Sequence, residues 1–279
     1  MLNYKSVFIA ILVAYIIGTM VLGVYFAMHG IELRYVSLLE VVIFFVPLLF
    51  VVGSDNSKDS GSELLAIYKP TLGGYFKLNK FPISITPFIL WGLVGVMLME
   101  MGVDVVSVRL LPDSIMEYYI QITEKYLEMQ NSLSINGSGT LLEMGEIILL
   151  VALVPAVCEE FLFRGYLLRN LLVHHSVGYS VCISALIFSL IHFNPIALLP
   201  IFIIGVYLGM LYYATGSIFP SIIFHFCNNL FVIISANYED SNSDAMLGLW
   251  LAFGIIVAGG ILVYWTYSRI RKDCGVGNV

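Results

Sequence analysis

Three ionisable side chains interrupt an apolar stretch near the middle of the chain. Glu159, Glu160 and Arg164 lie within an apolar run at about 147–172 that is long enough to cross a bilayer. If all three were unpaired and faced lipid, inserting them would cost on the order of 7–10 kcal/mol. We therefore expect them to face protein or water. The alternative is that they lie at the cytoplasmic interface and snorkel into the headgroups.

The spacing gives the two carboxylates different roles. Glu160 and Arg164 are four residues apart, so on a helix they lie on one face and can form an ion pair. Glu159 lies about 100° around the helix from Glu160 and has no such partner. The pattern predicts one structural carboxylate and one carboxylate that is available as a general base.

Two histidines and an asparagine fall in later apolar runs. His192 ends the stretch from Phe188, and His225 and Asn229 are four residues apart, so they share a helix face. If the chain turns near 175–176, Glu159 and His192 each lie roughly 24 Å from that turn along antiparallel helices. Simple counting places His225 at a shallower depth, so a helix tilt or a short helix must bring it to the others.

This set of side chains suits hydrolysis. Glu159 with His192 could hold and deprotonate a water, and His225 with Asn229 could donate hydrogen bonds to the oxyanion of a tetrahedral intermediate. Arg164 could anchor Glu160 or the substrate backbone. We assign no cofactor and no metal, but zinc is an open alternative, with Glu159, His192 and His225 as its ligands across three helices. The motifs HExxH and GxSxG are absent from the sequence.

The composition identifies the class of protein that must position these residues. Of the 279 residues, 59% are hydrophobic and only 11% are charged, whereas a soluble domain carries about 25% charged residues. This excludes a soluble enzyme, a disordered tail and a coiled coil. The net charge of −6 excludes nucleic acid as a partner. The four cysteines show no CxxC spacing, and we interpret them as small apolar residues.

The fold predicted from these features is all-α, a polytopic bundle of about eight transmembrane helices. The expected spans share a length and hydropathy suited to the bilayer, and they cover about 7–27, 35–52, 82–103, 147–172, 177–193, 196–213, 217–236 and 246–267. The fifth and sixth are short and could instead form a re-entrant pair. In the sixth, Gly205 and Gly209 are expected to permit close approach of a neighbouring helix.

We divide the chain into three regions. Residues 1–140 hold the N-terminal spans, a polar linker at 53–80 and a segment at 104–140 that is expected to form an amphipathic helix at the membrane surface. Residues 141–236 form the helical core with the candidate catalytic residues. Residues 237–279 supply the last span and a basic tail.

Basic and acidic residues alternate between successive loops. Lysines and arginines gather in the linker, after the fourth span and in the C-terminal tail, while acidic residues fill the opposite loops. The positive-inside rule then places both termini in the cytoplasm. We expect a multi-pass protein in the plasma membrane of a prokaryote.

The three polar motifs resemble those of the CPBP family of intramembrane peptidases. Glu159-Glu160-xxx-Arg164-Gly165, Phe188-xxx-His192 and His225-xxx-Asn229 occur in the family's order, within apolar helices and at similar distances. This family comprises peptidases of the type II CAAX prenyl protease and bacteriocin-processing (Abi) kind. The resemblance covers about 150–236.

The resemblance implies that Glu159 is the general base, that His192 helps to position the water, and that His225 and Asn229 stabilise the oxyanion. It implies that Glu160 and Arg164 support the site, and that the partners are the lipid bilayer and a peptide or lipidated-protein substrate. The family is described both as metalloproteases and as using a metal-free glutamate mechanism, and we favour the second. Two other classes stay open: an ion- or proton-coupled transporter, and a non-catalytic immunity or scaffold protein.

Overall fold

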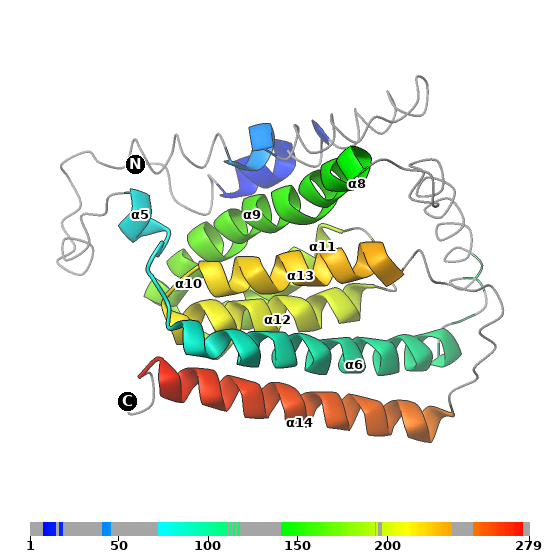
Figure 1. Ribbon diagram of the computed structural model, residues 1–279. Helices are drawn as coiled ribbons and strands as arrows, with labels where there is room; N and C mark the ends of the chain where they lie inside the picture. The colour runs from blue at the N-terminus through cyan, green and yellow to red at the C-terminus, as the bar shows by residue number, and fades with distance from the viewer. Residues whose placement is uncertain are drawn as a thin grey trace.

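The computed structural model describes residues 8–14, 17–18, 41–45, 72–110, 141–192, 194, 197–235 and 248–275, with the isolated positions 112, 114 and 117. All regular structure in these ranges is helical, as predicted. The longer elements run side by side, and the run that contains α9 is inclined to the others (Figure 1). They are α6 (Thr86–Leu110), the run from α8 to α10 (Leu141–His174), α11 (Val177–Leu190), α12 (Leu198–Thr215), α13 (Phe219–Ser235) and α14 (Leu249–Asp273).

Three described helices are long and apolar enough to cross a membrane, at Ile83–Ser107, Leu198–Thr215 and Leu249–Asp273. Two shorter apolar helices, at Val177–Leu190 and Phe219–Ile234, accompany them. The fold is therefore an all-α bundle of membrane helices. Of the expected spans at 7–27 and 35–52, the structure describes only 8–14, 17–18 and 41–45, which are helical. Most of the polar linker and most of the amphipathic segment lie outside the described residues.

Two helices extend beyond their predicted ends. Helix α6 continues through Leu110, so Asp104, which we had assigned to a surface segment, lies on the membrane helix. No helix breaker occurs before Pro112, and the residue before a proline disfavours helix, which explains the later end. Helix α14 likewise continues to Asp273 and carries the basic residues of the predicted tail in its last turns, where cations interact favourably with the helix dipole.

The helices are arranged so that α12 and α13 lie at the centre (Figure 1). Helix α6 packs along α14, and α11 packs along α12. Helix α13 contacts both α9 (Val154–Glu160) and the preceding π-helix η3 (Ile148–Leu153). This arrangement places the fourth predicted span directly against α12 and α13.

The predicted close approach at Gly205 is confirmed. A Cβ atom on Gly205 would lie 3.0 Å from the Cβ of Ala185, and one on Gly209 would lie 3.2 Å from Val181. Both neighbours are on α11, so the two small residues let α11 and α12 pack closely. The antiparallel turn also forms where it was expected, because α10 (Arg169–His174) ends before His175 and α11 begins at Val177.

We expect Gly205→Val to destabilise the protein by about 1–3 kcal/mol, because the added methyl groups have no space at this helix contact. Thermal unfolding of the purified protein in detergent measures the effect. Gly260→Val is the matched control, because a Cβ at Gly260 on α14 would meet nothing within 4 Å. Equal loss of stability in both variants would show that close packing at Gly205 is unimportant.

Candidate active site

The helix that carries the two glutamates widens on both sides of them. Helix α9 contains a proline in its first turn and ends at Glu160, between the π-helices η3 and η4 (Phe161–Leu168). Pro155 has no N–H for the helical hydrogen-bond ladder, and the wide turns precede it directly. Such π-helical stretches are rare and frequently mark functional sites. Here they flank the short α-helical segment that presents Glu159 and Glu160.

The predicted ion pair between Glu160 and Arg164 is confirmed. Arg164 Nη1 donates to Glu160 Oε1 at 2.7 Å, and both side chains are completely buried. Arg164 Nη2 donates to the Gly205 carbonyl at 3.1 Å, which ties this pair to α12. The guanidinium also lies 4.6 Å above the Phe188 ring. A buried arginine needs this many partners, because an unpaired charge in the interior costs several kcal/mol.

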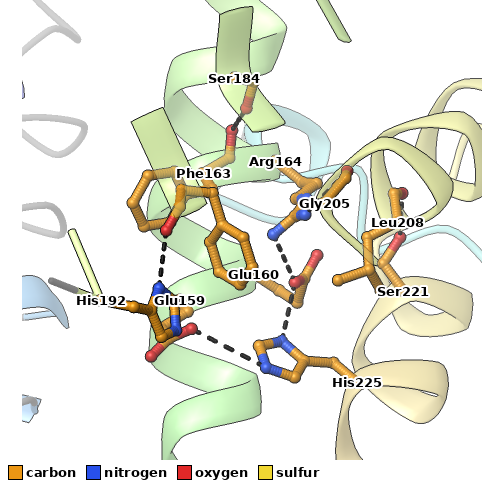
Figure 2. A network of polar contacts seen from close by, with 11 residues as sticks. Glu159, Glu160, Phe163, Arg164, Ser184, His192, Gly205, Leu208, Ser221 and His225 are labelled. Atoms are coloured by element: carbon orange, nitrogen blue, oxygen red, sulfur yellow. Dashed lines mark hydrogen bonds and ion pairs between the residues drawn. The ribbon is translucent and has the colours of Figure 1, made fainter. Parts of the chain in front are cut away.

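His225 joins the two carboxylates (Figure 2). Its Nδ1 donates to Glu160 Oε1 at 3.0 Å, and its Nε2 lies 3.8 Å from Glu159 Oε2. The expected approach of His225 to the glutamates is confirmed. Counting residues alone places His225 too shallow, and packing of α13 against α9 closes that gap. The sequence also assigned Glu160 to Arg164 alone, whereas Glu160 holds His225 in orientation as well.

Glu159 is buried, with 7% of its surface exposed. Its Oε2 is enclosed, and no hydrogen-bond partner for this atom exists among the residues that the structure describes. The separation of 3.8 Å from His225 Nε2 is too long for a hydrogen bond. This carboxylate oxygen therefore keeps an acceptor site that a hydrogen-bond donor such as a water would satisfy.

His192 lies in the turn after α11, since that helix ends at Leu190 rather than continuing to about 193. Its Nδ1 is 2.7 Å from the Phe188 carbonyl. A carbonyl only accepts hydrogen bonds, so Nδ1 carries the proton and Nε2 of a neutral imidazole is an acceptor. The side chain is exposed. Figure 2 shows it at the same end of the polar network as Glu159.

Asn229 lies one turn beyond His225 on α13 and is half-buried. Its Nδ2 donates to the Ala152 carbonyl of η3 at 3.5 Å. This distance is at the long limit for a hydrogen bond, so the amide can be recruited by a ligand at little cost. The structure thus brings Glu159, Glu160, Arg164 and His225 together. The described hydrogen bonds of His192 and Asn229 go instead to the backbone carbonyls of Phe188 and Ala152.

Comparison with known protein families matches residues 145–231 to the family described as type II CAAX prenyl endopeptidase Rce1-like. The matched segment is similar to this family, and we refer to residues 145–231 as the Rce1-like domain. The family resemblance seen in the motifs is therefore confirmed, and all six candidate residues fall inside the matched range. Comparisons with curated proteins and with solved structures give no match.

Phe188 contacts several of the site residues, and the sequence did not predict these contacts. The Phe188 ring lies 5.0 Å from the His192 ring and 5.8 Å from the His225 ring, both edge-on. Phe188 therefore contacts both imidazoles and Arg164 while its carbonyl fixes His192. The spacing of four residues between Phe188 and His192 is the signal that could have indicated this contact.

The zinc alternative requires Glu159, His192 and His225 to converge on one ion. Within the described part of the Rce1-like domain, no group of three His, Cys, Asp or Glu side chains is arranged to hold a metal. The proposed set does not fit a tetrahedral zinc site as these residues stand, and the chemistry below is derived from the side chains alone.

Proposed function

We propose that this protein is an intramembrane endopeptidase that hydrolyses a peptide bond of a membrane-associated peptide or lipidated protein. One observation carries the proposal. The buried Glu159 carboxylate has an oxygen without a described hydrogen-bond partner, and it faces His225 inside an Rce1-like domain. Glu160 also has one oxygen without a described partner, but its Oε1 is held by both Arg164 and His225, so Glu159 is the carboxylate that is left to act as a base.

Glu159 and His192 bind and activate the water in this mechanism. The water donates one hydrogen bond to Glu159 Oε2 and one to His192 Nε2, whose acceptor state is set by the Phe188 carbonyl. Glu159 removes a proton as the water oxygen attacks the carbonyl carbon of the scissile bond. The protonated Glu159 then delivers this proton to the leaving amine nitrogen as the carbon–nitrogen bond breaks.

His225 and Asn229 stabilise the oxyanion that forms during attack. In the doubly protonated form of His225, Nδ1–H donates to Glu160 and Nε2–H donates to the oxyanion. The Glu160 carboxylate offsets the charge of the resulting imidazolium. The long hydrogen bond of Asn229 leaves its amide able to turn toward the same oxygen. Glu160 and Arg164 act as positioning residues.

The experiment compares cleavage of fluorogenic peptides with and without a prenylated cysteine, using wild-type protein in detergent. We expect cleavage, and proteoliposomes of the same protein should show no ion or proton flux. Flux without cleavage would instead identify a membrane relay built from the same charges. Neither flux nor cleavage of any peptide would support a non-catalytic membrane protein.

We expect cleavage to survive metal chelation. Incubation with a strong chelator followed by its removal should leave the rate within about twofold of the untreated enzyme, because the proposed water is activated by the side chains of Glu159 and His192. Elemental analysis of the treated protein checks that no metal persists. Loss of activity that added zinc restores would contradict the metal-free mechanism.

A further inference from the structure

A second polar cluster lies away from the glutamates, at the end of the bundle where α6 begins and α12 ends. Lys77 follows the short helix α5 (Leu72–Tyr75), and its Nζ lies 4.6 Å above the ring of Tyr212 on α12. Arg169 begins α10, and its guanidinium lies 3.8 Å above the ring of Tyr75. Neither cation forms an ion pair with a carboxylate in the described parts of the chain.

These two cations repel each other in a partly buried setting. Burial lowers the pKa of Lys77, and the nearby Arg169 guanidinium lowers it further. Aromatic rings offset part of the positive charge, but they do not satisfy the N–H donors of an ammonium or a guanidinium. An arrangement that holds two like charges together without an acid is favourable when an anion lies between them.

The chain around Lys77 is held in a strained conformation. Lys77 has φ 52°, in the left-handed region that non-glycine residues rarely adopt. Its carbonyl accepts a hydrogen bond from Ile218 N at 3.1 Å. Asn79 donates to the Gly216 carbonyl at 3.0 Å, and Ser217 Oγ donates back to the Asn79 carbonyl at 2.7 Å. These bonds clamp the segment onto the α12–α13 turn and fix the backbone that carries the ammonium.

The Tyr212 hydroxyl supplies an independent observation. Tyr212 is completely buried, and its hydroxyl has no hydrogen-bond partner within the described residues. The Lys77 ammonium lies over the ring of the same Tyr212, and Arg169 lies over the ring of Tyr75, two residues before Lys77. Among the described residues, this phenol has no acceptor and the two nearby cations have no carboxylate partner, so one anion would satisfy all three donors.

We propose that Lys77, Arg169 and the Tyr212 hydroxyl form a binding site for a phosphate group, supplied by the headgroup of an anionic phospholipid. A guanidinium presents paired donors that match phosphate oxygens, and an ammonium adds a point charge. The position favours a lipid over a free ion, because α6 and α12 are membrane-spanning helices that start and end here. Lys77 and Arg169 are both half-buried rather than fully exposed to water.

Lipid binding here would act on the packing that supports the Rce1-like domain. Phe76, next to Lys77, is buried against Phe161 of η4 with ring centroids 4.8 Å apart. A headgroup that bridges Lys77 and Arg169 therefore holds the same loop against the helix that bears Arg164. The site contributes to stability and lies outside the proposed hydrolytic machinery.

The test measures thermal unfolding of the delipidated full-length protein in detergent against added phosphatidylglycerol or zwitterionic phosphatidylcholine. Only phosphatidylglycerol should raise the unfolding temperature. The concentration needed should increase about fivefold or more in Arg169→Gln and Tyr212→Phe. Tyr212→Phe keeps the ring and so preserves packing. Unfolding of each variant in phosphatidylcholine verifies that it is folded.

Lys272→Gln is the matched control, because Lys272 is exposed near the end of α14, at the same end of the bundle. An equal loss of phosphatidylglycerol response in Lys272→Gln would reduce the effect to general surface charge and overturn the site. Equal stabilisation by both lipids would overturn it as well. An equal shift of the unfolding temperature with inorganic phosphate or glycerol phosphate would show that the site binds a free anion. It would overturn the proposal that a lipid headgroup is the ligand.

Discussion

Glu159→Gln should lower the rate of peptide cleavage by roughly 10²–10⁴-fold, the usual contribution of a general base. The substitution keeps the size of the side chain and removes only its ability to accept a proton. Glu159 Oε2 makes no described hydrogen bond, and it lies 3.8 Å from His225 Nε2. Few native contacts are lost, so the unfolding temperature should stay close to that of the wild type. Cleavage of a fluorogenic peptide in detergent measures the rate.

Asp104→Asn serves as the control for this prediction. It also neutralises a carboxylate on a membrane helix, but α6 carries Asp104 outside the Rce1-like domain. Its cleavage rate should match the wild type. A Glu159→Gln variant that cleaves at a wild-type rate would remove Glu159 from the mechanism, whatever the family of the domain.

Glu160→Ala should destabilise the fold by about 3–5 kcal/mol, because it leaves a buried arginine without its counter-charge. Arg164 is completely buried, and its other described hydrogen bond goes to the neutral carbonyl of Gly205, so no other described carboxylate hydrogen bond compensates its charge. His225 loses its acceptor in the same variant. The unfolding free energy in detergent, from denaturant or thermal data, gives the magnitude.

A double-mutant cycle separates the ion pair from simple loss of packing. Arg164→Met removes the unpaired charge, so the double variant Glu160→Ala/Arg164→Met should recover part of the stability lost in Glu160→Ala. Additive losses from the two substitutions would show that the pair has no coupling energy. Glu160→Ala should also lower activity, because His225 is no longer oriented.

Much of this arrangement was predictable from residue types and short-range spacing. The ion pair between Glu160 and Arg164 follows from a separation of four residues, which is a local property of a helix. The composition was sufficient to predict an all-α membrane bundle. The three motifs in order were sufficient to predict the resemblance to the peptidase family. The turn at His175 could be located because polar residues separate two apolar runs.

The position of His225 could not be predicted, because it depends on how α13 lies against α9. Counting residues from a turn gives depth along one helix, but tilt and packing decide which side chains meet. The end of α11 before His192 could not be predicted either, because a difference of a few helical residues changes where the imidazole lies. Which membrane face each helix end occupies and the three-part division of the chain stay predictions.

The wide turns after Glu160 have a consequence for engineering the chain. The N–H of Arg169 bonds to the carbonyl of Arg164, five residues earlier, where ordinary α-helix would span four. Four residues make about one turn of ordinary α-helix, and here five residues close the turn. Removing one amino acid between these positions would therefore return the coil to its usual pitch and leave Arg169 at about the same angle around the axis. The extra residue is absorbed within a single turn, so the chain carries one more side chain beside the glutamate pair without rotating the rest of the helix.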